Sequence, residues 1–190
     1  MEDLDQIHDQ ECQYTVQLRG IVDGEPKRIN RIVTSVADAV DAYGEYQKYA
    51  DYAKLDSLRY IVSNTTEAGI VYDDTDRLEM EPPKSYRQIN QILYERYKHF
   101  NGAMDKGLVM LPVELIDDNG IHLKECVEKL AVLWNLEEGF KTWLDEACVF
   151  TSTLVDRIVT GYPRDEAEEL CKEFGYQDNL IVTVSHLLSG

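Results

Sequence analysis

Alternating apolar and polar residues predict that the ordered part of the chain begins with β-strands. Tyr14, Val16 and Leu18 are apolar and their neighbours are polar, which is typical of a strand with one buried face. Asp23–Gly24 indicates a turn, and residues 29–34 are expected to return as a second strand. Residues 1–13 are acidic and lack a periodic pattern. We therefore expect a loose N-terminal arm over 1–13 and one domain over 14–190.

Helical and strand-like patterns alternate through the rest of the chain. Serine at a helix start and an acid or glutamine three residues later form the capping-box pattern, which occurs at Ser35–Asp38 and at Ser85–Gln88. The predicted order is a helix over 35–52, a strand over 58–63, a helix from 85 to about 100, a strand over 108–111, helices from 119 and around 140–147, a strand from 153 and a helix over 163–174. This alternation predicts an α/β fold with a mainly parallel sheet of four to six strands and helices on both faces.

Polar residues follow or interrupt two of the predicted strands. Asn64–Glu67 comes directly after the strand over 58–63, and ligands bind at the carboxyl ends of strands in open α/β sheets. Asp156 and Arg157 interrupt a strand-like apolar run, and burying two charges costs several kcal/mol unless they are paired or used. The two charges predict either a functional site or a structural ion pair at a strand end.

Composition narrows the classes of partner. Hydrophobic residues make up 44% of the 190 residues and charged residues 29%, as in ordinary globular domains. The formal net charge of −17 opposes binding to nucleic acids and to anionic membranes, which both need clustered Lys and Arg. No apolar run approaches the roughly 18 residues that a membrane span needs, and the acidic first residues do not resemble a secretion signal. A cytoplasmic location is expected.

Several kinds of catalytic or metal site find no support in the sequence. The four cysteines are scattered and form no Cys-x-x-Cys pair, so they are expected to be reduced core residues. The four histidines lack the spacing of zinc ligands, and no metal site is predicted. No two glycines are separated by a single residue and no Gly-Lys-Ser or Gly-Lys-Thr occurs, which excludes both common phosphate-binding loops from this sequence.

Four segments in series resemble the mannitol dehydrogenase family, whose members are polyol-specific long-chain dehydrogenases. The segments are Ser63–Ile70, Phe100–Gly107, Leu111–Gly120 and Ser152–Glu166, within a resemblance that runs from about residue 14 to 178. The resemblance implies NAD as the cofactor, a small-molecule sugar acid as the substrate, and the interconversion of D-tagaturonate and D-altronate without a metal. It departs from the family pattern at Val113, where a Cys is expected, and beyond residue 181.

The resemblance also implies that the fold is an incomplete Rossmann-like domain. Family members have an N-terminal Rossmann-like domain and a mostly helical C-terminal domain, and this chain resembles the later part of the first. A glycine-containing first strand turn and the family's catalytic Lys, Asn and His have no counterpart in this sequence. We therefore expect no catalytic residue within the 190 residues. The isolated chain is expected neither to bind NAD tightly nor to turn over.

Site residues follow from the resemblance position by position. The segment that matches the nicotinamide end of the cofactor pocket consists of Asn64, Thr65, Thr66 and Glu67. For Thr65 and Thr66, helix capping is the structural alternative. Asp156 matches a residue that accepts hydrogen bonds from substrate hydroxyls, and Arg157 would hold that carboxylate in place.

Two further substrate contacts are expected. Asn119 matches a position near the substrate, although capping of the following helix would also explain it. A strongly acidic chain must counter its own field to hold an anion, so Arg164 is a candidate for the uronate carboxylate, with Lys84 as another. A surface ion pair of Arg164 with Asp165 or Glu168 is the alternative.

A non-enzymatic remnant or a protein-interaction module that retains the middle of the fold is the alternative function. Strands of a doubly wound sheet that lack their usual neighbours expose an edge and apolar faces. Self-association through such an exposed sheet edge is therefore a further expectation.

Overall fold

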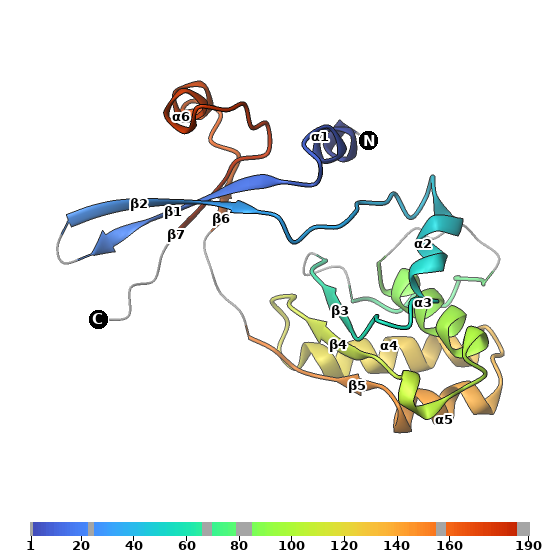
Figure 1. Ribbon diagram of the computed structural model, residues 1–190. Helices are drawn as coiled ribbons and strands as arrows, with labels where there is room; N and C mark the ends of the chain where they lie inside the picture. The colour runs from blue at the N-terminus through green and yellow to red at the C-terminus, as the bar shows by residue number, and fades with distance from the viewer. Residues whose placement is uncertain (1, 23–24, 66–69, 79–84, 155–158, 186–190) are drawn as a thin grey trace. The chain divides into compact units, whose positions relative to one another are not determined.

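A computed structural model of the chain describes residues 2–22, 25–65, 70–78, 85–154 and 159–185 (Figure 1). The residues form two compact units, which we describe one at a time. Unit 1 consists of Met1–Asp41 together with Asp156–Gly190, and unit 2 consists of Ala42–Val155.

Unit 2 contains a parallel sheet of three strands in the order β3-β4-β5. Its elements are α2 (Tyr46–Tyr52), β3 (Tyr60–Ser63), α3 (Ser85–His99), the 3-10 helix η1 (Met104–Lys106), β4 (Val109–Pro112), α4 (Asn119–Leu133), α5 (Glu138–Glu146) and β5 (Val149–Phe150). The predicted strands over 58–63 and 108–111 are thus confirmed, and so are the three helices after residue 85.

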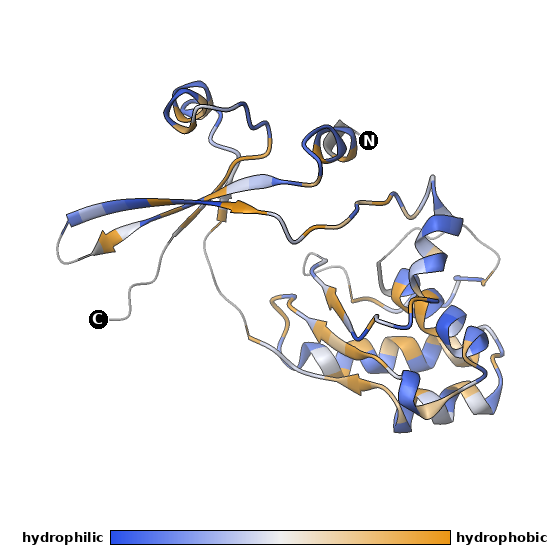
Figure 2. Cartoon of the chain, in the orientation of Figure 1, coloured by the Kyte–Doolittle hydropathy of each residue, from blue (hydrophilic) through white to orange (hydrophobic). Residues whose placement is uncertain are grey.

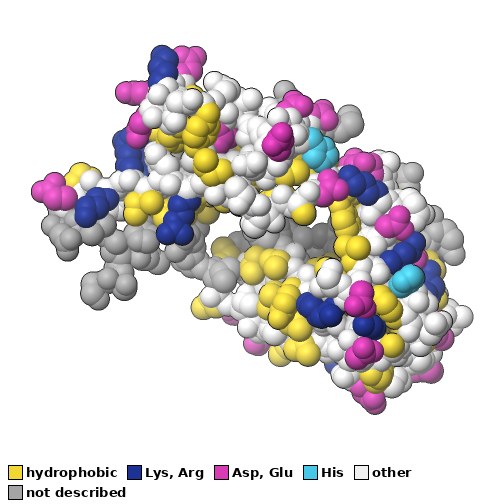
Figure 3. Space-filling model, in the orientation of Figure 1, with side chains coloured by type: hydrophobic (Ala, Val, Ile, Leu, Met, Phe, Trp, Pro, Cys, Tyr) yellow, Lys and Arg dark blue, Asp and Glu magenta, His cyan; other side chains and the backbone are white. Residues whose placement is uncertain are grey.

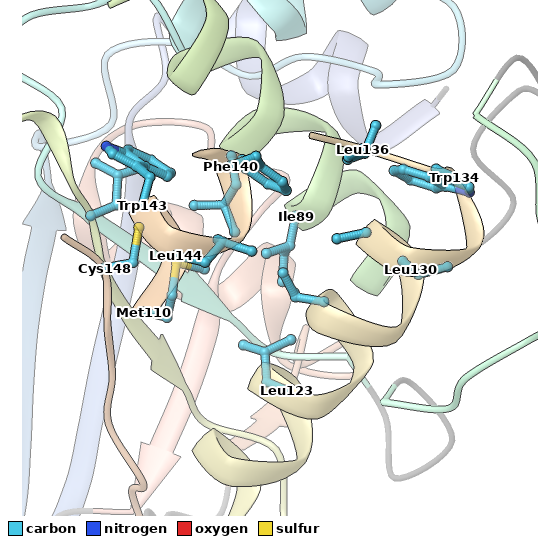
Figure 4. Close-up of a cluster of buried hydrophobic side chains, with 14 residues drawn as sticks. Ile89, Met110, Leu123, Leu130, Trp134, Leu136, Phe140, Trp143, Leu144 and Cys148 are labelled. Atoms are coloured by element: carbon cyan, nitrogen blue, oxygen red, sulfur yellow. The ribbon is translucent and has the colours of Figure 1, made fainter. Parts of the chain in front are cut away.

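Helices α3, α4 and α5 share one hydrophobic core with a single face of this sheet (Figure 4). Met110 of β4 is fully buried in that core and is in register with Ile61 and Phe150. Phe140, Trp143 and Leu144 enter it from α5, as the helical spacing predicted. Figure 2 shows β3, β4 and β5 mostly in hydrophobic colours and α3, α4 and α5 with both hydrophobic and hydrophilic residues, as amphipathic packing requires.

The opposite face of the same sheet carries exposed apolar side chains. Tyr60 is in register with Val109 and Val149, and Tyr60 and Val149 are 63% and 51% exposed. Val62, two residues along β3 and therefore on the same face, is also 63% exposed. Parallel sheets are normally covered on both faces, so this face of unit 2 is apolar surface of the kind that packs against other elements.

Two buried arginines tie α3 to its surroundings. Arg96 is fully buried and donates hydrogen bonds to the carbonyl oxygens of Ala53, Leu55, Leu58 and Lys106 at 2.6–3.1 Å. Burial lowers the pKa of Arg96, and the charge of Arg59 lowers it further. Arg87, also fully buried, forms a salt bridge with Asp76 at 2.9 Å.

Unit 1 contains a mixed sheet of four strands in the order β2-β1-β7-β6. Its elements are α1 (Glu2–Asp9), β1 (Tyr14–Val22), β2 (Glu25–Val33), β6 (Val159–Gly161), α6 (Ala167–Phe174) and β7 (Val182–Ser185). β1 pairs with β2 in antiparallel register and with β7 in parallel register, which confirms the two strands predicted near the start of the chain. With the parallel sheet of unit 2, this confirms the α/β class.

Polar side chains connect the strands of unit 1 to its loops. The carboxylate of Asp178 accepts hydrogen bonds from the backbone amides of Thr15 and Leu180 at 2.7 and 2.8 Å. Arg19 of β1 forms two parallel hydrogen bonds to the carboxylate of Glu166, both at 3.0 Å, and they lower the pKa of that carboxyl group. The turn before α6 is thereby fixed on the sheet.

The structure differs from the predicted elements in several places. The strand predicted from residue 153 is absent at Thr153 and Leu154, and the structure instead has β5 before it and β6 after it. Residues 2–9 form helix α1 where a loose arm was expected, and Cys12 just after it is buried. The helix predicted over 35–52 is present only from Tyr46, because Gly44 disfavours helix and the Asp38 carboxylate accepts its hydrogen bond from the adjacent Ala39 amide at 2.8 Å. α6 begins at Ala167, four residues after Pro163, since Pro163 first forms a turn with Glu166.

Candidate functional site

The candidate site lies at the carboxyl edge of the parallel sheet in unit 2. Strands β3, β4 and β5 run in the same direction, so the residues that follow them meet at one edge. Asn64 and Thr65 follow β3, Glu114 follows β4, and Thr153 follows β5. Backbone bonds connect these ends, because the amide of Val113 donates to the carbonyl of Ser63 at 2.8 Å.

Glu114 is the buried acid of this edge. Only 4% of the residue is exposed. Its Oε2 accepts a hydrogen bond from the Ser63 hydroxyl at 3.1 Å, and its Oε1 accepts from the backbone amide and the hydroxyl of Thr65 at 3.1 and 2.9 Å. One carboxylate therefore holds the residues on both sides of Asn64. Nothing local in the sequence distinguished Glu114 from other acids in loops, and only the adjacency of β3 and β4 reveals its role.

Asn64 and Thr65 differ in what they leave open to a ligand. The Asn64 side chain is exposed, and among the described residues it makes no hydrogen bond. The Thr65 hydroxyl donates to Glu114, so it retains only acceptor capacity for a ligand. The residues that Thr65 would cap begin at 66 and fall outside the described residues, so the capping alternative for Thr65 stays open. Thr66 and Glu67 fall outside the described residues.

Asn119 joins the ends of β4 and β5. It is fully buried, and its amide nitrogen donates to the carbonyls of Pro112, Glu114 and Thr153 at 3.0–3.1 Å. Its amide oxygen accepts from the backbone amide of Thr153 at 3.0 Å. The expectation that Asn119 caps the helix is wrong, because Asp118 occupies the cap position and makes no side-chain cap bond. The side-chain amide of Asn119 is committed to the protein itself.

Gly120 allows α4 to approach the segment after β5 closely. A Cβ atom at this position would lie 2.3 Å from the carbonyl oxygen of Thr151 and 2.9 Å from the amide nitrogen of Ser152. Only glycine fits this contact. The Asn119–Gly120 pair noted in the sequence therefore shapes the carboxyl edge of the sheet.

Arg164 lies in unit 1, on the rim of a shallow hollow. The hollow is lined by Gln6, Tyr162, Arg164, Asn179, Leu180, Ile181 and Val182. Arg164 is exposed and forms no salt bridge within the described residues, so the alternative of a pair with Asp165 or Glu168 is not seen. Asp156, Arg157 and Lys84 fall outside the described residues.

Other chemistry is limited within the part of the chain that the structure describes. It contains no group of three or more His, Cys, Asp or Glu side chains that could hold a metal ion. All four cysteines are free and buried, as predicted. Among the described helices, none has the length and apolar character that a membrane span requires. On the face shown in Figure 3, acidic and basic side chains are interspersed.

Comparison with known proteins identifies the family. Residues 3–188 match the family described as the mannitol dehydrogenase Rossmann domain. The chain belongs to this family. It is 44% identical to the altronate oxidoreductase of Bacillus subtilis over 182 residues, and this match covers 95% of the chain and 38% of that protein. It is 47% identical over 175 residues to the altronate oxidoreductase of Pectobacterium atrosepticum, covering 91% of the chain and 36% of that protein.

Two solved structures are similar to the chain in fold. A D-sorbitol dehydrogenase in substrate-free form is similar with a TM-score of 0.77 and 17% identity, over 98% of this chain and 40% of that one. The ternary complex of Pseudomonas fluorescens mannitol 2-dehydrogenase with NAD and D-mannitol is similar with a TM-score of 0.78 and 20% identity, over 97% of this chain and 38% of that one. In this chain, Glu114 and Asn119 organise the carboxyl edge of the parallel sheet within the Rossmann-like fold. The chain spans under two-fifths of the length of these curated relatives.

Proposed function

We propose that this chain forms part of an NAD-dependent oxidoreductase that interconverts D-tagaturonate and D-altronate. The observation that carries the proposal is the identity of 44–47% with altronate oxidoreductases over more than nine-tenths of the chain. The organised carboxyl edge of the parallel sheet supports it, since Rossmann-like folds bind dinucleotides there.

The residues at this edge fit the polar end of a dinucleotide. The segment Asn64–Glu67 holds the nicotinamide and its ribose in this proposal, with the exposed Asn64 amide as a direct contact. The bound NAD supplies the hydride chemistry. The part of this chain is to bind and orient the cofactor, whereas the family's catalytic Lys, Asn and His have no match in this sequence.

Four residues are assigned to the substrate site, two as direct contacts and two as positioning residues. Asp156 would accept hydrogen bonds from hydroxyls of the sugar acid, and Arg157 would hold the Asp156 carboxylate in place. Asn119 acts as a positioning residue, because its amide is fully used inside unit 2. Arg164 would bind the uronate carboxylate, and the absence of a salt bridge to it among the described residues supports this role.

A hybrid enzyme tests the proposed function. In this hybrid, the chain replaces the matching segment of the Bacillus subtilis altronate oxidoreductase. The hybrid is expected to oxidise NADH when D-tagaturonate is supplied. The 190-residue chain alone is expected to show no such activity and no micromolar affinity for NADH. A soluble, folded hybrid without activity would contradict the proposed function. Micromolar binding of NADH to the isolated chain in a calorimetric titration would contradict the second expectation.

Replacing Arg164 by methionine tests the carboxylate contact. In the hybrid enzyme, Arg164→Met is expected to raise KM for D-tagaturonate by about tenfold or more, while KM for a neutral ketose stays nearly unchanged, since only the uronate offers an anion to the guanidinium. Arg31→Met removes another exposed arginine and serves as the control. Equal effects of Arg164→Met on the acidic and the neutral substrate would refute this assignment.

A second candidate function, self-association, is favoured by the exposed apolar face of the sheet in unit 2. The edge strand β2 of unit 1 is unsuited to pairing with its own copy, because Pro26, Lys27, Arg28 and Arg31 would repel or interrupt it. β3 is an uncharged edge strand, and its side chains Tyr60 and Val62 are exposed. We therefore propose that two copies of the chain associate through β3. The replacement Val62→Lys is expected to return a dimeric chain to a monomer on size-exclusion chromatography, and a wild-type chain that is monomeric throughout excludes this function.

A further inference from the structure

We propose that Glu114 is a positioning residue of the cofactor site, which fixes the loop after β3 so that the Asn64 amide faces the nicotinamide end of the dinucleotide. The inference rests on the proposed function for its ligand. The carboxylate itself touches no cofactor in this proposal, and it acts through Ser63 and Thr65.

The contacts of Glu114 favour this role over a direct one. A carboxylate accepts about four hydrogen bonds, and Glu114 already accepts three from Ser63 and Thr65. The residue is 4% exposed, so it presents almost no surface to a ligand. Asn64, between the two donors, is exposed. The arrangement turns one side chain outward by holding its two neighbours inward.

Glu114 is itself held in place. Its carbonyl oxygen accepts a hydrogen bond from the Asn119 amide at 3.0 Å, and the same amide donates to the carbonyls of Pro112 and Thr153. Through Asn119 and Glu114, the ends of β3, β4 and β5 are connected by buried side chains. Such support sets the precision with which a site residue meets its ligand.

The Thr65 hydroxyl distinguishes most sharply between a role through Glu114 and direct binding of the cofactor. If it serves Glu114, as the 2.9 Å bond indicates, its removal matters only while the carboxylate is present. If it binds the cofactor directly, its removal matters in every background. A double-mutant cycle separates the two cases.

The experiment compares Glu114→Leu, Thr65→Val and the double variant in the hybrid enzyme defined above. Glu114→Leu is expected to weaken NADH binding by at least about tenfold, because a displaced loop loses its contacts with the ligand. Adding Thr65→Val to Glu114→Leu is expected to cause no further loss. The same loss from Thr65→Val in both backgrounds overturns the proposal, and so does unchanged NADH affinity in Glu114→Leu.

Additional variants distinguish positioning from a general loss of structure. The inhibition constant of ADP, which lacks the nicotinamide and its ribose, is expected to change by less than about twofold in Glu114→Leu. Glu114→Gln is expected to retain most of the NADH affinity, since its amide oxygen can still accept from Thr65 and its amide nitrogen can donate to Ser63. Glu146→Leu removes an exposed acid of unit 2 and is the matched control. A parallel loss of ADP binding overturns the positioning role.

Hydrogen exchange on the 190-residue chain gives a readout that does not depend on the cofactor. The backbone amide of Thr65 donates to Glu114, so Glu114→Asp, with a carboxylate drawn back by one methylene, is expected to speed its exchange by about tenfold. Unchanged exchange overturns the positioning role even if Glu114→Leu fails to fold. If the wild-type hybrid binds no NADH while exchange responds as expected, the proposed function fails and the structural role of Glu114 stands.

Discussion

Replacing Gly120 by alanine is expected to lower the free energy of unfolding of unit 2 by about 3 kcal/mol. The added Cβ would lie 2.3 Å from the carbonyl oxygen of Thr151 and 2.5 Å from its carbonyl carbon. Both are backbone atoms, and the Thr151 amide is bonded to the Met110 carbonyl at 3.1 Å, so the segment cannot move without loss. Trp134 and Trp143 both belong to unit 2, so urea denaturation followed by tryptophan fluorescence measures this quantity.

The control for Gly120→Ala is Gly139→Ala in helix α5. There the new Cβ would meet the Tyr97 hydroxyl at 2.5 Å, which is the far end of a side chain that can shift. Alanine also favours a helix over glycine by up to about 1 kcal/mol, which offsets this contact. We expect Gly139→Ala to change the stability by less than about 1 kcal/mol. If both variants lose the same stability, the close approach of α4 is not what makes Gly120 necessary.

The sequence predicted most elements of unit 2 because their signals are local. The helix from Ser85 and the strands before residues 64 and 113 follow from periodic apolar positions and turn residues. The prediction of a helix from residue 35 was wrong, because a capping pattern does not reveal other hydrogen bonds that the capping side chains can form. In the structure the Asp38 carboxylate accepts from its neighbour Ala39, and Gly44 lies in the predicted helical interior.

Long-range contacts explain why the roles of Asn119 and Glu114 were not foreseen. Next to a helix start, Asn119 has the local pattern of a cap, yet its partners Pro112, Glu114 and Thr153 lie up to 34 residues away. Glu114 becomes informative only when β3 and β4 are known to be neighbours, since its donors are about 50 residues earlier in the chain. Asn64 was predicted as a candidate from its place after a strand, which is a local signal, and the structure places it at the carboxyl end of β3.

Replacing Arg96 by methionine is expected to destabilise unit 2 by about 4 kcal/mol, although the hydrophobic volume is nearly kept. The guanidinium donates to four backbone carbonyls, of which those of Ala53 and Leu55 lie just after α2 and that of Leu58 just before β3. Methionine offers no donor, so these buried oxygens would lose their partners. Without them, α2 and the start of β3 are held to α3 less firmly. Urea denaturation followed by tryptophan fluorescence again gives the loss.

Two controls separate the hydrogen bonds of Arg96 from its charge and its packing. Arg59→Met removes an exposed arginine beside the same segment and is expected to change stability by less than about 1 kcal/mol. Arg96→Lys keeps the charge and the packing over Phe100, where the guanidinium carbon of Arg96 lies 4.8 Å from the ring centroid. An ammonium group has three donors on one atom and cannot reach four separated carbonyls, so about half of the loss is expected to remain. A lysine variant as stable as the wild type would show that charge, rather than the fork of donors, stabilises this part of unit 2.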